Sequence, residues 1–121
     1  MPVFLLFFGA AAVSGALLRW GASNLLGAPW STFAVNILGS FLMGYLFFNF
    51  KDNHDAVWRL PLLVGFLGAF TTYSSFSLEC LQFLQAEDYR GFVSYLFLMN
   101  TLCILGCWGG CLLYTSPSPR D

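Results

Sequence analysis

A run of glycine, hydroxyl-bearing and aromatic residues is the part of the sequence best suited to chemistry. It reads GFLGAFTTYSSFSLE, from Gly65 to Glu79, inside a stretch that is otherwise apolar. Lipid offers no water to backbone groups, so a helix interrupted at membrane depth must be surrounded by protein or by a wet cavity. Glycines weaken the helix here, and the hydroxyls supply hydrogen-bond donors. The order of hydroxyls and aromatics favours a conduction site, with close helix packing as the alternative.

A second candidate is Asn36, an amide within the apolar stretch 30–50. Such a group costs several kcal/mol in hydrocarbon unless it is hydrogen-bonded, so it must face protein or water. The common role of an asparagine in this setting is a hydrogen bond between helices.

The composition is that of a membrane protein. Of the 121 residues, 58% are hydrophobic and 9% are charged, whereas soluble domains carry about a quarter charged residues. A span needs roughly 20 residues, which leaves room for about four spans. The net charge of −1 provides no basic surface for nucleic acid. The start of the chain lacks a basic segment, and we interpret it as the first span rather than a signal peptide.

We expect one all-α transmembrane domain over residues 1–114, followed by a polar tail, 115–121, that is disordered or non-native. The expected spans cover residues 2–22, 30–50, 60–84 and 91–114, with the third helix broken. The polar loop 51–59 contains His54 between two aspartates. Because no second ligand cluster or nucleophile accompanies this histidine, we predict neither a catalytic metal nor an enzyme.

Three cysteines recur every four residues on one face of the fourth span, namely Cys103, Cys107 and Cys111. This spacing could suit a soft metal. We interpret the cysteines as small apolar packing residues, because no further thiolate is within reach by sequence.

Positive charges are nearly balanced between the two sides of the membrane. Lys51 and Arg59 share a side with Arg120 of the tail, whereas Arg19 and Arg90 lie on the other side. Orientation follows the Lys/Arg bias, so this chain has little reason to choose one direction. Four spans are also few for enclosing a pore. We therefore predict an antiparallel homodimer with dual topology.

Three motifs resemble those of the Fluc/CrcB family of fluoride channels. The run from Gly65 to Glu79 is similar to that family's third-span signature, VNILGSF (residues 35–41) to the second, and GALLRW (residues 15–20) to the first. The likeness covers about residues 4–114, with the fourth span matched mainly by pattern. The resemblance implies a multi-pass protein of the cell (inner or plasma) membrane. It would form an antiparallel homodimer that exports fluoride passively through two pores around a central structural Na⁺.

The resemblance also implies roles for individual residues. Gly68 and Thr71 would bind Na⁺ through their backbone carbonyls, and Arg19 would lie near the vestibule. The fluoride pathway would comprise Asn36, Tyr73, Phe76, Ser74, Ser75, Ser77 and Glu79.

Three positions depart from the family pattern. Tyr73 replaces the usual phenylalanine, Ala69 a frequent glycine, and Trp20 a frequent tyrosine. Physical chemistry agrees with the resemblance, because a strongly hydrated anion needs neutral hydrogen-bond donors and positive aromatic edges in place of water.

The alternative function is a small multidrug-type proton-coupled exporter. Such a transporter requires a carboxylate embedded in the membrane. The first span has no acidic residue, and Glu79 lies late in the third. A subunit that only packs against partners would explain the glycines and serines but not the order of donors and aromatics.

Overall fold

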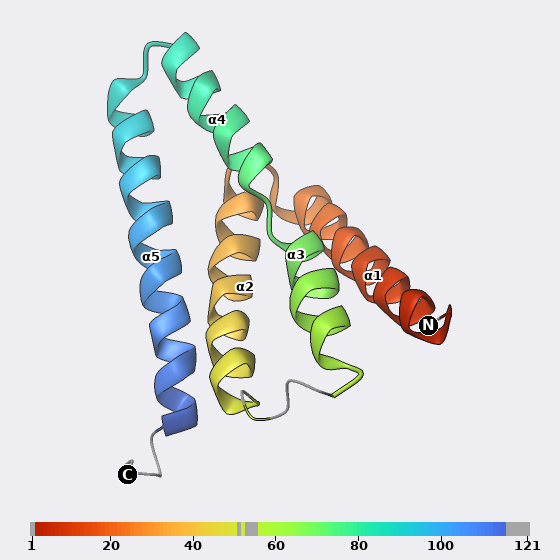
Figure 1. Ribbon diagram of the computed structural model, residues 1–121. Coiled ribbons are helices and arrows are strands. Elements are labelled where there is room, and N and C mark those ends of the chain that lie inside the picture. Colours follow the sequence, from red (N-terminus) through yellow and green to blue (C-terminus); the bar gives the residue numbers. More distant parts are fainter. Residues whose placement is uncertain (1, 51, 53–55, 116–121) are drawn as a thin grey trace.

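The computed structural model describes residues 2–50, 52 and 56–115, and this part of the chain is helical without a β-strand (Figure 1). The elements are α1 Pro2–Leu26, α2 Trp30–Asn49, the π-helix η2 Pro61–Phe66, α3 Leu67–Phe70, α4 Tyr73–Gln85 and α5 Tyr89–Thr115. Four segments are long and apolar enough to cross a membrane, namely α1, α2, the run η2–α3–α4, and α5. The predicted all-α fold with four spans and a broken third helix is confirmed.

The outer spans are longer than the sequence suggested. α1 continues to Leu26 instead of ending near residue 22, because the backbone first turns left-handed at Gly27, whose φ is 74°. α5 begins at Tyr89 rather than residue 91, because Asp88 Oδ1 accepts a hydrogen bond of 2.9 Å from the Gly91 amide. α5 ends at Thr115. The predictions for His54 and for residues 116–121 lie outside the described residues.

The helices form two packed groups around the third span. α2 and α5 lie side by side, and α1 packs against η2 and α3 (Figure 1). Buried side chains form one cluster on each side of the helix break. The first contains Val35, Leu63, Leu67 and Phe70, and the second contains Phe76, Cys80, Tyr95 and Met99.

Glycines allow the backbones of α2 and α5 to approach closely. A Cβ atom at Gly44 would collide with the carbonyl of Cys107, and one at Gly110 with the carbonyl of Phe41. Gly15 of α1 faces the Phe66 carbonyl in the same way. Without a hydrophobic driving force in lipid, helices associate through such close packing.

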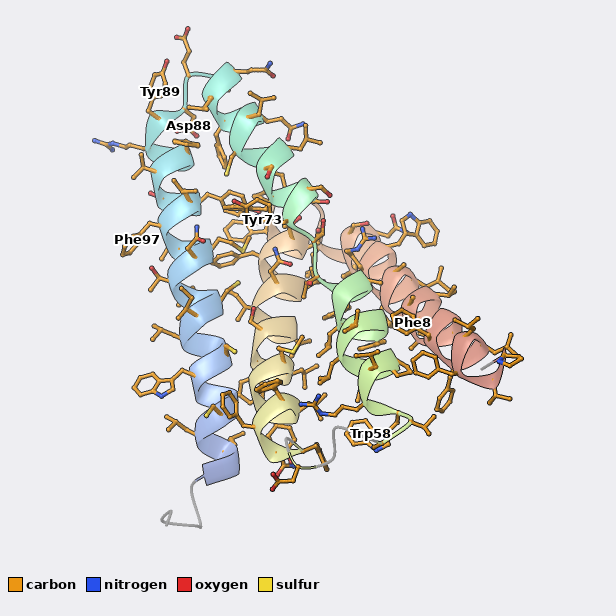
Figure 2. All side chains as sticks on the ribbon, viewed as in Figure 1. Phe8, Trp58, Tyr73, Asp88, Tyr89 and Phe97 are labelled. Carbon is orange, nitrogen blue, oxygen red and sulfur yellow. The ribbon has the colours of Figure 1, made fainter. Side chains whose placement is uncertain are left out.

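The outward faces of the helices are apolar. Large side chains such as Trp20, Phe97 and Trp108 are more than half exposed, and Figure 2 shows Phe97 pointing away from the bundle. Such exposure would be costly in water but suits a surface that contacts lipid or another membrane helix.

Adding one methyl group to α5 should destabilise the protein at one of two adjacent glycines and not at the other. Gly110→Ala should lower the free energy of unfolding by about 1–3 kcal/mol, because the new Cβ collides with backbone. Gly109→Ala is the matched control, since its Cβ would meet only Phe41 Cδ2 at 4.0 Å. Unfolding in detergent measures both. Equal stabilities would contradict the close α2–α5 contact.

Candidate functional site: the break in the third span

The third span is interrupted at two threonines. α3 ends at Phe70, and Thr71 and Thr72 adopt extended backbone conformations, with φ/ψ of −88°/160° and −151°/118°. The Thr72 hydroxyl then accepts a hydrogen bond of 3.2 Å from the Ser75 amide and thereby caps α4. The hydroxyl run of the sequence therefore places the break and starts the next helix.

Asn36 holds the interrupted backbone from the neighbouring helix. Its Nδ2 donates to the Thr72 carbonyl at 3.0 Å, and its Oδ1 accepts from the Thr72 amide at 2.8 Å. Asn36 itself is buried on α2. The side-chain amide thus satisfies both backbone groups of one residue that has left the helix. Sequence reasoning predicted that Asn36 faces protein or water, with a hydrogen bond between helices as its common role, but did not identify the broken backbone as its partner.

The carbonyls at the end of α3 divide into satisfied and free ones. Leu67 O accepts bonds of 3.0 and 3.1 Å from the Thr71 amide and hydroxyl, and Ala69 O accepts one of 2.9 Å from Arg19 Nε. Within the described part of the chain, the carbonyls of Gly68 and Thr71 accept no hydrogen bond. Gly68 is also exposed, and a Cβ atom added there would meet no other atom within 4 Å.

Arg19 lies two turns inside α1 rather than at its end. Its bond to Ala69 O places a cation at the carboxyl end of α3, where the helix dipole is negative. The structure therefore brings this predicted vestibule residue to the break itself.

A cleft of about 360 Å³ opens at the break. It brings together five of the predicted residues, namely Asn36, Gly68, Thr71, Tyr73 and Phe76. The wall opposite is formed by α5, through residues that sequence reasoning did not assign to the site, among them Met99, Asn100, Cys103 and Cys107. Only their spacing on one helical face could have suggested this wall. None of the described charged side chains lines the cleft.

The hydroxyls after the break are connected to one another. Thr72 Oγ1 donates to Ser75 Oγ at 3.1 Å and lies 3.3 Å from Ser74 Oγ. Ser74 and Ser77 are exposed on α4. These groups form a neutral, polar edge along the first turn of α4.

Tyr73 and Phe76 lie together as their spacing predicted, with ring centroids 5.4 Å apart. Their surroundings differ, since Tyr73 is 74% exposed and Phe76 is 2% exposed. Phe76 also contacts Tyr95 of α5, at 5.2 Å between centroids. Figure 2 shows Tyr73 at the start of α4, beside the break.

Glu79 lies away from the cleft, two turns further along α4. Thr32 Oγ1 donates to its Oε2 at 2.7 Å, and the Tyr95 hydroxyl donates to its Oε1. The carboxyl group is buried and also borders a second cavity of about 320 Å³ near the α4–α5 turn. Buried polar groups in a membrane must be paired in this way. Glu79 therefore joins α4 to α2 and α5.

Four spans, a broken helix at membrane depth and a neutral cleft beside the break define a multi-pass membrane protein with an intramembrane site. The family described as "CrcB-like protein, Camphor Resistance (CrcB)" matches residues 5–111. This chain belongs to that family, and the resemblance of its motifs is confirmed.

Several relatives have names that state an activity. A Coxiella burnetii protein named fluoride-specific ion channel FluC is 41% identical, over 93% of this chain and 97% of its own length. The Listeria monocytogenes protein named fluoride-specific ion channel FluC 1 is 35% identical, over 93% and 98%. An Acidithiobacillus ferrooxidans protein named fluoride-specific ion channel FluC is 39% identical, over 86% and 90%.

Removing the Asn36 amide should loosen the break specifically. Asn36→Leu leaves the Thr72 amide and carbonyl unpaired and should lower the free energy of unfolding by about 1–3 kcal/mol. Hydrogen exchange of the Thr72 amide should accelerate more than that of amides within α5. Asn100→Leu is the matched control, because the Asn100 amide is exposed and bonds only to Leu96 O of its own helix, at 2.7 Å. Unchanged exchange at Thr72 would contradict the proposed backbone contact.

Proposed function

We propose that this protein is a fluoride-specific ion channel that allows passive fluoride export across the cell membrane and so reduces fluoride toxicity. The observation that carries the proposal is the neutral cleft at the break of the third span, in a chain whose relatives are named fluoride-specific channels. Those names also agree with the expectation that the chain is not an enzyme.

The cleft offers fluoride what its hydration water would offer. Ser40 and Thr72 place hydroxyl groups in the lining of the cleft. One N–H of the Asn36 amide bonds to the Thr72 carbonyl, and Nδ2 also lies 3.7 Å from Met99 Sδ, so the second N–H has only a thioether as partner. A thioether is a weak acceptor, so this N–H is available to an anion. Several neutral donors in series bind an ion well enough to admit it and weakly enough to release it.

The small multidrug-type exporter is not supported. Its mechanism needs a carboxylate that exchanges protons with its substrate. The carboxyl group of Glu79, within the described spans, is instead held by Thr32 and Tyr95 outside the cleft.

Phe76 provides the sharpest test of the pathway. If its ring edge contacts the anion, Phe76→Ile should reduce fluoride efflux from liposomes about tenfold, the factor that corresponds to an aromatic interaction of about 1.4 kcal/mol. Tyr73→Phe should conduct normally, because the ring edge is retained. Chloride efflux serves as the selectivity control. A folded Phe76→Ile protein that conducts fluoride at the wild-type rate would assign Phe76 to the core alone.

The functional unit in this proposal is an antiparallel homodimer. A single chain has few buried residues and a wide apolar outer face, and its cleft is bounded by α2, the break and α5. Arg19 lies inside α1 and therefore no longer counts among the cations that flank the spans. Without Arg19, the flanking cations are Lys51 and Arg59 on one side of the membrane and Arg90 on the other. A difference of about one cation still gives little bias in orientation.

Dual topology predicts equal labelling on both faces of the membrane. Asp52→Cys lies in the loop after α2, and Ala86→Cys lies in the turn after α4, at the opposite end of the bundle (Figure 1). A membrane-impermeant thiol reagent applied to intact cells should modify about half of each variant. The wild-type chain measures background from the native cysteines. Complete labelling of one variant with protection of the other would contradict dual topology.

The free carbonyls at the end of α3 fit a structural Na⁺. Hard cations bind oxygen ligands, and the carboxyl end of a helix carries partial negative charge. Gly68 and Thr71 would hold the ion through these oxygens. Two oxygens are fewer than the about six that hard cations commonly take, so a second copy of the chain would complete the site. The bound ion would compensate the unpaired carbonyls and join the two subunits.

Sodium removal should therefore weaken the dimer. Replacing Na⁺ by N-methylglucamine should shift wild-type protein in detergent toward monomer, as measured by sedimentation. Gly68→Leu should produce the monomer even with Na⁺ present, because a large side chain would fill the space beside the free carbonyls. Thr71→Ser keeps the backbone and the hydroxyl bond to Leu67 O and should behave as wild type. A wild-type dimer indifferent to Na⁺ would contradict the ion assignment.

A further inference from the structure

The α5 wall of the cleft carries sulfur where the α4 edge carries hydroxyls. Met99, Cys103 and Cys107 follow one another at intervals of four residues, and all three line the cleft. Met99 is 4% exposed, and the two cysteines are half-buried. All four cysteines of the chain are free thiols. The cleft therefore has a row of soft donors that the fluoride pathway does not require.

Two of these sulfur atoms are as far apart as two sulfur ligands of one metal ion. Cys103 Sγ lies 3.8 Å from Met99 Sδ. Metal–thiolate bonds of about 2.3 Å place two sulfur ligands of one tetrahedral ion roughly 3.8 Å apart. The pair could accept an ion without moving the helix backbone, because both residues lie on consecutive turns of α5.

The chemistry of the donors selects the kind of ion. Among the described residues, no group of three or more His, Cys, Asp and Glu side chains could hold a metal, which disfavours a zinc site. A thioether beside a thiol is typical of sites for Cu⁺ and similar soft ions. We propose that Met99 and Cys103, with Cys107 one turn further on, form a binding site for a soft monovalent cation such as Cu⁺.

Binding involves no change of oxidation state. A bond forms between the cation and Cys103 Sγ while the S–H bond breaks, and the proton leaves to water through the cleft. Met99 Sδ donates a lone pair without losing a proton, and copper remains Cu⁺. The monovalent cation replaces the Cys103 proton, so the net charge of the site does not change. Because the site borders the break, the bound ion would be a solid obstacle in the cleft. This second consequence rests on the proposed fluoride pathway, whereas binding itself does not.

Competition for Cu⁺ tests the site directly. Purified protein in detergent, under ascorbate and without oxygen, should withdraw Cu⁺ from the coloured chelator bicinchoninate. Cys103→Ala keeps a small apolar residue and should weaken binding at least about tenfold, as should Met99→Leu, since loss of even a supporting residue costs a metal site that much. Cys111→Ser is the matched control, because Cys111 lies on the same helical face but outside the cleft. Wild-type affinity in Cys103→Ala, or no competition by the wild type, would overturn the proposal.

Two further measurements test whether the sulfur atom itself is required and whether the site lies on the fluoride pathway. Cys103→Ser keeps the size of the side chain but replaces a soft donor with a hard one, so it should bind as weakly as Cys103→Ala if the protein elutes as wild type. In liposomes, Ag⁺ in chloride-free buffer should inhibit fluoride efflux through wild type and Cys111→Ser but not through Cys103→Ala. Wild type that conducts no fluoride without metal would refute the proposed function and leave the Cu⁺ competition as the decisive test. Equal silver sensitivity in all variants would overturn the placement of the site on the pathway.

Discussion

A helix that breaks inside a membrane leaves polar backbone groups where no water can reach them, and the arrangement of this protein follows from that constraint. Each unpaired group in such a setting costs several kcal/mol. Here the break is compensated from three directions. Asn36 of α2 bonds to both backbone groups of Thr72, Arg19 of α1 bonds to Ala69 O, and the Thr72 hydroxyl caps α4. The carbonyl groups left without a hydrogen bond belong to Gly68 and Thr71, two residues that line the cleft.

The helices around the break are packed so that these contacts can form. Gly15 lets α1 approach the Phe66 carbonyl, which brings Arg19 within reach of α3 one turn later. Gly39 of α2 lies against the Thr71 side chain, three residues beyond Asn36. Glycines therefore do more here than permit close packing. They bring α1 and α2 so close to the broken span that side chains of these two helices can form hydrogen bonds with its backbone.

Much of the fold could be predicted from the sequence, because the composition of a membrane protein indicates which segments contact lipid. Span number, the break and the adjacency of Tyr73 and Phe76 follow from apolar length, hydroxyl clustering and helical period. The partners could not be predicted, because they join residues distant in sequence, as Asn36 joins Thr72 and Glu79 joins Thr32 and Tyr95. Sequence reasoning ends α1 too early. It takes Gly21 as the start of the linker, whereas the helix continues until the left-handed residue Gly27. It also assigns the α5 cysteines to packing, because spacing alone does not show that Met99 lies beside them in the cleft.

The charged side chains near the break lie outside the cleft, and the cleft itself is lined by neutral groups. Neither Arg19 nor Glu79 lines the cleft, since the first bonds to a backbone carbonyl and the second is held by two hydroxyls. The cleft is lined, among the described residues, by amides, hydroxyls, aromatic rings and sulfur. A fixed cation in the cleft would hold an anion too strongly for rapid release, and a fixed anion would exclude it. By using its charged side chains to stabilise the fold, the chain keeps the cleft neutral. Polar but uncharged donors can then replace hydration water without trapping the ion that they bind.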